Sequence, residues 1–373
     1  MSTSHSMSRA ASRCNLAALG VPGPVWAVTA IVREPNRWGR GSGAVRRTSA
    51  WVLTAAAALL AVGSGGLFAL RFLPADALPV RPDTVAMAAA FTDFAAPGFF
   101  ASTVLAGTAL LLRQRRPQAA LAVLCAVATV VQVAALAPRW VAAPVPATSG
   151  SFTVLALNSR LGYADPAEVA RTAAAADVVV LTEVTRPQAR ALEVTGFSQQ
   201  FPHRSEGRLP AAGAAGTAVF SRFPITRTER LAPDLNHQNW VCTVTVPGVG
   251  PVQVVAVHPA RPYRGGSRWL PEQRILQDTL PTSGLRVLVG DFNAVASHPT
   301  QRALRDAGWR TAVDQTGAGW APTYPADSGR LPALIDIDHA YVSDGLQATA
   351  LRRVEVSGTD HLGLLVTVGV KPA

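Results

Sequence analysis

Three long apolar stretches dominate the first part of the chain. Residues 50–70, 95–112 and 117–138 hold no charged side chain, and the middle stretch reaches back towards Thr84 if Asp93 lies near a membrane interface. Each stretch is long enough to cross a hydrocarbon core of about 30 Å as a helix. Buried helices of a soluble domain seldom run this long without a polar face. The pattern therefore predicts transmembrane helices at about residues 50–70, 90–112 and 117–138.

After residue 150 the pattern changes to short strand-like runs, with helical segments between some of them. Several of these segments open at a proline, such as Pro166 and Pro299, because a helix does not need the missing N–H there. Residues 247–250 form a turn too short for a parallel crossover, so part of the sheet structure must be antiparallel. Two mixed sheets between helices fit better than a doubly wound parallel sheet. The predicted strands are 152–157, 178–181, 218–220, 241–246, 252–257, 287–289, 339–342 and 364–370, and the predicted helices are 165–175, 187–194, 271–280 and 299–307.

The composition divides the chain near residue 150 into a membrane part and a globular part. Residues 1–49 are rich in Ser, Arg and Gly, which predicts a disordered basic segment, and residues 50–141 form the predicted membrane domain. A linker rich in Pro, Ala and Ser, residues 142–150, would let the next domain stand off the bilayer. The globular domain then covers residues 151–373, enough to build its own core.

Most of the positive charge lies in the membrane part. Residues 1–150 hold 13 arginines against 4 acidic residues, a net charge of +9, whereas residues 151–373 carry only the remaining +2 of the total +11. The globular domain therefore lacks the strong basic excess typical of nucleic-acid binding. Arginines cluster before the first stretch and between the second and third, at Arg33, Arg37, Arg40, Arg46, Arg47, Arg113, Arg115 and Arg116. The positive-inside bias then places the N-terminus in the cytoplasm and everything after Arg139 outside the membrane.

The three cysteines exclude a disulfide framework. Cys14 lies in the basic segment, Cys125 in the third apolar stretch, and Cys242 alone in the globular part. Cys242 falls in the apolar run 240–246, where we expect a small buried hydrophobe rather than a nucleophile.

Glu183 is the first candidate for chemistry, because it follows the continuous apolar run 178–181. A carboxylate at the end of such a buried strand needs a cation, and Mg²⁺ is a hard ion that takes carboxylates and phosphate oxygens together. The alternative is a salt bridge to Arg186 or Arg190. Asn158 ends the first strand and could share the ion, orient a phosphate or act as a turn residue.

Two further pairs of polar residues follow strands later in the chain. Asp291 and Asn293 lie one residue apart after a glycine, so both side chains can point to one place, where one orients a water and the other an oxyanion. His258 and His361 follow strand runs or adjoin a proline or an aspartate, and imidazole exchanges protons near neutral pH. A carboxylate is expected to hold His361 in one tautomer, and the spacing leaves both Asp336 and Asp338 open for that role.

The order of these segments resembles the endonuclease/exonuclease/phosphatase superfamily. The resemblance covers about residues 151–370 and implies a four-layered α/β sandwich that hydrolyses a phosphodiester or phosphomonoester with Mg²⁺, or with Mn²⁺ in its place. It rests on Asn158, Leu181-Thr-Glu183, Gly216-Thr-Ala-Val-Phe-Ser-Arg-Phe-Pro224, Val257-His258, Gly290-Asp-Phe-Asn293, Ile337-Asp338 and Thr359-Asp-His-Leu362.

The resemblance implies a metal site built around Glu183, the principal ligand, with Asn158 and Asp360 nearby. Two positions depart from the family pattern. Thr182 stands where a glutamine is common, which alters the lining of the site, and Asp336 stands where an arginine often precedes the Ile-Asp pair. The second departure bears on which aspartate partners the catalytic histidine.

The same resemblance implies the roles of the remaining candidates. Asp291 and Asn293 resemble the pair that positions the attacking water and the phosphate. His258 resembles the histidine that contacts or protonates phosphate oxygens. His361 resembles the catalytic histidine, with Asp338 as its carboxylate partner.

We therefore expect a multi-pass membrane protein with an outward-facing, Mg²⁺-dependent phosphoesterase domain, and nuclease activity as its leading specific form. The alternatives are hydrolysis of a phospholipid or sphingolipid head group, which tethering to the bilayer favours, and a non-catalytic domain that binds a phosphorylated ligand. Trp320 and Tyr324 could stack a base or a sugar, or simply pack. Arginines that could recognise phosphate fall in the loops, at Arg204, Arg208, Arg261, Arg264 and Arg268.

Overall fold

The computed structural model describes residues 37–113, 115–143, 149–205, 207–263, 268–327, 329 and 331–371. Residues from Arg47 onward form one compact unit, which holds both the apolar helices and the sheets. Residues 1–36 of the segment expected to be disordered lie outside the described residues. Its last residues are helical and begin α1 (Arg37–Leu70), because an established helix adds one hydrogen bond for each residue that it gains.

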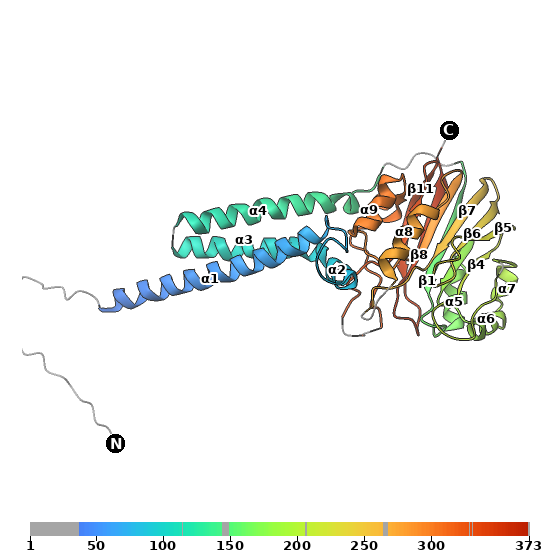
Figure 1. Ribbon diagram of the computed structural model, residues 1–373, viewed down its shortest axis with the longest axis horizontal. Helices are drawn as coiled ribbons and strands as arrows, with labels where there is room; N and C mark the ends of the chain where they lie inside the picture. Colours follow the sequence, from blue (N-terminus) through green and yellow to red (C-terminus); the bar gives the residue numbers. More distant parts are fainter. Residues whose placement is uncertain are drawn as a thin grey trace, which may run out of the picture. The chain divides into compact units, whose positions relative to one another are not determined.

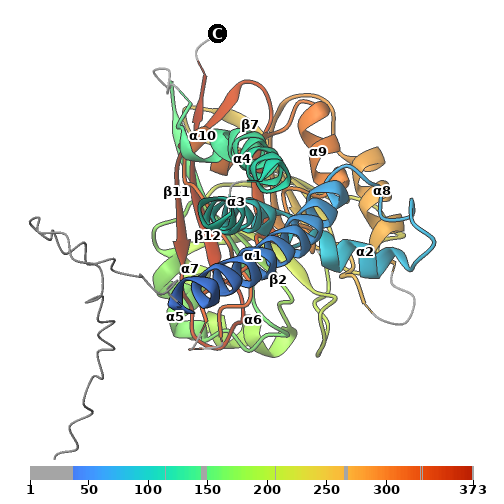
Figure 2. The same cartoon turned by 90° about the vertical axis from the view of Figure 1, so that its left-hand side faces the viewer.

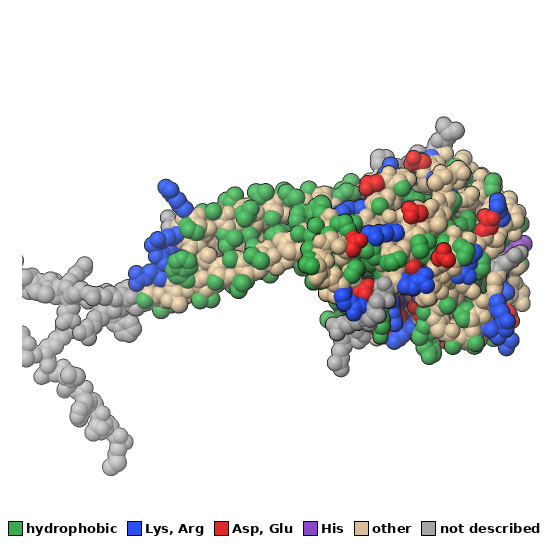
Figure 3. Space-filling model, viewed as in Figure 1, with side chains coloured by type: hydrophobic (Ala, Val, Ile, Leu, Met, Phe, Trp, Pro, Cys, Tyr) green, Lys and Arg blue, Asp and Glu red, His purple; other side chains and the backbone are tan. Residues whose placement is uncertain are grey.

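Three helices are long and apolar enough to cross a membrane, at Gly43–Leu70, Thr92–Leu112 and Arg116–Trp140. They correspond to α1, to η1 (Thr92–Phe94) with α3 (Ala95–Leu112), and to α4 (Arg116–Leu136) with η2 (Ala137–Trp140). Large apolar side chains cover their outer surface, and Leu59 and Leu111 are 76% and 84% exposed. Figure 3 shows this apolar cover, with Lys and Arg side chains at the end of the helices away from the sheets. The three predicted spans are confirmed as helices of this length and composition.

The rest of the unit contains two six-stranded mixed sheets. One has the order β11-β12-β1-β2-β4-β3 and the other β5-β6-β7-β8-β10-β9. β1 pairs with β2, and β7 with β8, in parallel, while the other pairs are antiparallel. The first sheet comprises β1 (Ser151–Asn158), β2 (Val178–Thr182), β3 (His203–Arg204), β4 (Thr217–Ser221), β11 (Leu346–Val354) and β12 (Gly363–Val370). The second comprises β5 (Ile225–Arg230), β6 (Trp240–Val246), β7 (Gly250–Val257), β8 (Leu285–Asp291), β9 (Arg310–Thr311) and β10 (Asp338–Val342).

The two sheets pack face to face, and helices cover both outer faces (Figure 1). Strand β2 shows how the sequence builds these layers: Val178 and Val180 join the core between the sheets, while Val179 and Leu181 join the core beneath the helices. The outer layers contain α5 (Pro166–Ala173), α6 (Arg186–Glu193) and α7 (Phe197–Gln200) on one side and α8 (Trp269–Thr279) and α9 (Pro299–Asp306) on the other, and α10 (Ala312–Thr316) follows β9. The predicted α/β sandwich is confirmed.

Cys242 lies in the core between the sheets and is fully buried. Burial raises the pKa of its thiol to about 12, so it stays protonated at neutral pH. The expectation of a buried hydrophobe rather than a nucleophile is confirmed.

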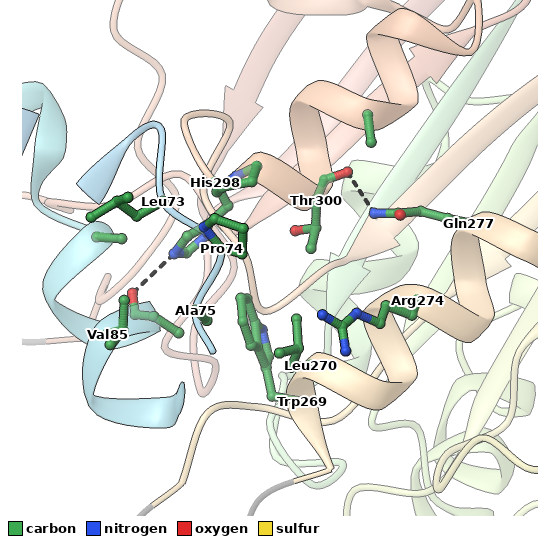
Figure 4. Close-up of a pocket in the computed structure, with 14 residues that line it drawn as sticks. Leu73, Pro74, Ala75, Val85, Trp269, Leu270, Arg274, Gln277, His298 and Thr300 are labelled. Atoms are coloured by element: carbon green, nitrogen blue, oxygen red, sulfur yellow. Dashed lines mark hydrogen bonds between the residues drawn. The ribbon is translucent and has the colours of Figure 1, made fainter. Parts of the chain in front are cut away.

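The connection between the first two apolar helices packs directly on the globular domain. It contains α2 (Pro82–Ala89), whose Val85 and Ala86 join the apolar core beneath α8 and α9. The Nε2–H of His298 donates to Ala86 O at 2.9 Å, and the hydroxyls of Thr92 and Ser297 lie 2.5 Å apart. Figure 4 shows His298 pointing towards α2 across a small apolar pocket. The connection is therefore part of the domain's packing.

The end of the third apolar helix is also joined to the domain. Gly319 N donates to Arg139 O, and Ala143 N donates to Gln315 O. Residue 143, at the start of the expected linker, is thus bonded to the domain, and residues 144–148 lie outside the described residues. That the linker holds the domain away from a bilayer stays a prediction. Figure 2 shows α3 and α4 nearly end-on in front of the domain, with α1 crossing the view obliquely.

Candidate functional site

The candidate residues meet at one edge of the two sheets because of how the strands run. Asn158 and Asp291 end β1 and β8, while Glu183 and His258 follow β2 and β7 directly. β10 and β12 run antiparallel to β8 and β1, so the starts of these two strands reach the same edge. Asp338 begins β10 directly opposite Asp291, and His361 precedes β12 by two residues. Polar residues far apart in sequence are thereby collected in one place.

The partner of His361 is Asp338. Its Oδ2 lies 2.8 Å from Nδ1 of His361, and both side chains are buried. The sequence left Asp336 as a competitor, but Asp336 interacts with Arg139 at the end of the third apolar helix. Burial raises the pKa of Asp336 to about 6, which the charge of Arg139 opposes. Asp338 is the first residue of β10, paired with Asp291 of β8, whereas Asp336 precedes the strand.

Asp291 lies at the centre of the site. Its Oδ2 accepts a hydrogen bond from Asn158 Nδ2 at 2.9 Å, and its Oδ1 accepts one from the backbone N–H of Asn293 at 2.8 Å. The same Oδ2 lies 3.7 Å from Nε2 of His258 and 3.9 Å from Nε2 of His361. Asp291 therefore connects the two histidines, and Asn158 and Asn293 hold it in place.

Glu183 faces the same group and is not neutralised by a neighbouring arginine. Its Oε2 accepts the backbone N–H of Leu161 at 2.8 Å, and its Oε1 lies 3.8 Å from Nε2 of His258. Arg186, one of the two partners that the sequence left open, instead donates to Leu209 O. Among the described residues, no ion pair joins Glu183 to Arg186 or Arg190. The carboxylate is thus directed into the site.

The backbone around these residues adopts unusual conformations. Glu183 and Asn293 have φ of +53° and +49°, in the left-handed region that ordinary residues rarely occupy. Gly290, just before Asp291, has φ of +142°, and a Cβ there would lie 2.1 Å from Val257 O. Such conformations cost about 1–3 kcal/mol each and persist where the surrounding structure demands them. Here they turn the side chains out of the strands and into the site.

The charges of the site strongly perturb its proton affinities. Burial and the nearby carboxylate of Asp338 raise the pKa of Asp291 to about 7. Burial lowers the pKa of His361, but the carboxylates of Asp338, Asp291 and Asp360 outweigh it and raise that pKa to about 10. Burial is the largest cause that lowers the pKa of His258 well below its usual range, and repulsion from His237 and His361 lowers it further. The two histidines therefore differ: His361 carries a proton and His258 is neutral.

The donor set fits a divalent cation. Oxygen atoms of Asp291 and Asp338 lie within 4.8 Å of each other, and Glu183 adds a carboxylate whose Oε1 lies 3.8 Å from Nε2 of His258, the same atom that Asp291 approaches. Clustered, largely buried carboxylates suit a hard ion such as Mg²⁺, which also accepts phosphate oxygens. Of the predicted ligands, Glu183 and Asp360 line the cavity. Asn158 donates from its amide nitrogen to Asp291 and accepts the N–H of Arg160 on its oxygen, and its part in holding a cation stays a prediction.

The site opens into a cavity of about 820 Å³ that also contains residues which the sequence did not single out. Arg160 lies 2.7 Å from Asp327 and 3.7 Å from Asp360, and its backbone adopts φ of +46°. The ring of His237 stacks on His258 with centroids 4.2 Å apart. Arg160 lies only two residues after Asn158, and that proximity is the one signal that could have found it. Nothing in the local pattern around His237 marks it.

The arginines and aromatics suggested by the sequence divide into two groups. Arg261 and Arg268 line the cavity, whereas Arg204 and Arg208 do not, and Arg264 lies outside the described residues. Tyr324 lines the cavity, with its ring centroid 5.0 Å from that of His361. Trp320 packs instead against Phe94 at the start of the second apolar helix.

Comparison with solved structures finds similar folds of low sequence identity. A structure described as an endonuclease/exonuclease/phosphatase from Beutenbergia cavernae is 23% identical over 60% of this chain and 72% of that one, with a TM-score of 0.49. A conserved Enterococcus faecalis protein of unknown function is 17% identical over 59% of this chain and 100% of its own, with a TM-score of 0.47. A Bacteroides vulgatus protein is 16% identical over 60% and 100%, with a TM-score of 0.46. No curated protein matches this chain.

A family model gives the decisive match. The description of that model is "Endonuclease/Exonuclease/phosphatase family", and it matches residues 155–361, more than half of the 373-residue chain. The matched range begins within β1 and ends at His361, so it spans every candidate site residue named above. The chain belongs to the endonuclease/exonuclease/phosphatase family and is a hydrolase of that family.

Proposed function

We propose that the protein is a membrane-anchored phosphoesterase that cleaves phosphodiester bonds outside the membrane and depends on Mg²⁺, with Mn²⁺ able to replace it. The observation that carries the proposal is the convergence of Glu183, Asp291, His258 and the His361–Asp338 pair on one cavity. A divalent cation held by Glu183, with Asp360 nearby, would neutralise charge on a phosphoryl group.

The side chains of the site divide the remaining chemistry between them. Asp291 accepts a proton from the attacking water, since its raised pKa of about 7 makes it a stronger base than an exposed aspartate. His361 carries a proton and donates from Nε2 to a phosphoryl or leaving-group oxygen, while Asp338 holds Nδ1. His258, which is neutral, and the amide of Asn293 orient the phosphate oxygens.

The sidedness of the domain is also a proposal, and two observations support it. Arg113, Arg115 and Arg116 mark the short second connection as cytoplasmic by the positive-inside bias. With three crossings, the first connection and the globular domain must then lie on the opposite side together. The hydrogen bond from His298 to Ala86 O joins those two parts, which agrees with this arrangement.

Hydrolysis of bis-p-nitrophenyl phosphate by the purified full-length protein in detergent tests the proposal. We expect turnover with Mg²⁺ or Mn²⁺, loss of turnover in EDTA, and recovery when the metal is restored. Glu183→Gln should lower kcat at least about a hundredfold, because it removes a charge from the metal site. Glu193→Gln, on the exposed side of α6, is the matched control and should behave like the parent. Turnover that survives EDTA, or a Glu183→Gln variant as fast as the control, contradicts the proposal.

A further inference from the structure

One wall of the active-site cavity comes from the membrane part of the chain. Ala86, Met87, Ala90 and Phe91 line the same cavity as the catalytic carboxylates and histidines. Phe91 directly precedes Thr92, where the second apolar helix begins. This wall therefore directly adjoins the end of the second candidate membrane span.

The wall is held in a fixed position. His298 uses both ring nitrogens: Nδ1 accepts the backbone N–H of Val295 at 2.9 Å, and Nε2–H donates to Ala86 O. Val295 itself lines the cavity, two residues after Asn293. One buried imidazole therefore joins the active-site loop to the connection between the membrane helices (Figure 4).

The rim of the cavity is apolar where it approaches the membrane helices. Met87 and Phe91 are 43% and 44% exposed, and Leu161 and Tyr263 on other parts of the rim are 43% and 61% exposed. Exposed apolar side chains that adjoin polar groups are typical of ligand-binding grooves and of membrane contacts. The rim therefore fits an amphipathic substrate.

Aromatic residues place this face of the domain at the membrane interface. Trp320 packs edge-on against Phe94, with ring centroids 6.0 Å apart, and Trp140 ends the third apolar helix while remaining 64% exposed. Tryptophan side chains concentrate at the level of lipid head groups. Arg160, Arg261 and Arg268 also line the cavity. Arg160 is paired with Asp327 and Asp360, and Arg268 with Glu272, and a guanidinium group can bind a phosphate beside such a partner.

We propose that the substrate is a phospholipid of the bilayer that the protein spans, and this inference rests on the proposed phosphoesterase function. The phosphodiester enters between the arginines and the catalytic residues, and the glycerol and first methylenes of the chains lie against Met87 and Phe91. Hydrolysis consumes one water, forms a P–O bond to it and breaks one P–O ester bond. The water's proton passes to Asp291, and the departing alkoxide takes a proton from His361, which leaves an alcohol and a phosphomonoester.

The test compares two substrates on the full-length protein reconstituted with Mg²⁺. The first is a vesicle of equal parts phosphatidylglycerol and phosphatidylcholine, and the second is bis-p-nitrophenyl phosphate, which has no acyl chain. The ratio of the two turnover rates is measured for the parent and for Met87→Ser/Phe91→Ser. We expect the ratio to fall at least about tenfold, since two apolar contacts with the lipid are lost. Met87→Leu/Phe91→Leu keeps the apolar area and should keep the ratio of the parent.

Val80→Ser is the matched control, because Val80 lies in the same connection, is 52% exposed and does not line the cavity. Its ratio should equal that of the parent. A parent that cleaves bis-p-nitrophenyl phosphate but no phospholipid overturns this inference and leaves the proposed function intact. Faster cleavage of single-stranded DNA than of phospholipid, unaffected by the serine variants, also overturns it and supports the nuclease prediction. Absence of turnover on every substrate overturns both.

Discussion

At the scale of single residues, the spacing along the chain left two possible partners for His361, and the structure shows which of them contacts it. Asp336 and Asp338 have the same side-chain chemistry and lie two residues apart. Only Asp338 reaches the imidazole, at 2.8 Å, while the charge of Arg139 acts on Asp336 and opposes the rise in its pKa. The pairing of β10 with β8 sets Asp338 opposite Asp291, which is a property of the sheet and not of the local sequence.

This assignment gives a pair of variants with opposite outcomes. Asp338→Asn should lower kcat on bis-p-nitrophenyl phosphate by about a hundredfold or more, because the imidazole loses the carboxylate that fixes its tautomer and its charge. Asp336→Asn should keep kcat within about threefold of the parent when rates are normalised to folded protein. A steady-state comparison of the two variants checks the assignment, and equal losses would contradict it.

At the scale of elements, every strand that the sequence pattern predicted is present, and the missed strands share one position. β3, β5, β9 and β11 are the edge strands of the two sheets. An edge strand has one partner and is often exposed, as β5 is over most of its length, so its sequence lacks a clear apolar pattern. Periodicity detects burial, and it therefore finds central strands and misses edges.

Gly290 tests how the end of β8 delivers Asp291 to the site. Gly290→Ala should destabilise the protein by at least about 2 kcal/mol, because its Cβ would overlap Val257 O and its φ is positive. Gly248→Ala, in the β6–β7 turn with φ of +72° and open space around it, carries only the conformational cost of about 1 kcal/mol. Thermal unfolding of the two variants in detergent measures the difference. Equal shifts in Tm would show that the close approach of β7 and β8 at Gly290 adds no destabilisation beyond the conformational cost.

At the scale of the whole molecule, the membrane part and the globular domain share both a core and a cavity. Val85 and Ala86 of α2 belong to the apolar core beneath α8 and α9, and Ala86 also lines the active-site cavity. His298 is central to this contact. Burial lowers its pKa to about 4, and burial does the same for His339, whose Nε2 donates to Ala294 O.

These two buried histidines predict that the folded protein loses stability in acid. In the unfolded chain these two imidazoles bind protons near pH 6.5, whereas in the folded protein they do so only near pH 4. The stability that their neutral forms contribute is therefore complete above pH 6.5 and decreases as the pH drops towards 4. Each of the two imidazoles contributes up to about 3 kcal/mol to the free energy of unfolding. His298→Gln, which keeps a donor for Ala86 O, should reduce the decrease in Tm between pH 6.5 and 4, because one of the buried histidines with a lowered pKa is removed. His203→Gln in edge strand β3 is the control, and a parent whose Tm does not depend on pH in this range contradicts the prediction.

The sequence by itself determined the three apolar helices, the central strands and the polar residues that follow them. Each of these is a local pattern, set by side-chain burial with a period of two or by unbroken apolar length. The tertiary structure alone decided that Asp338 rather than Asp336 contacts His361, that Arg160 and His237 join the site, and that Met87 and Phe91 form its wall. Those contacts link segments far apart in the sequence, such as Met87 and His361, and they depend on how strands and helices pack rather than on any spacing along the chain.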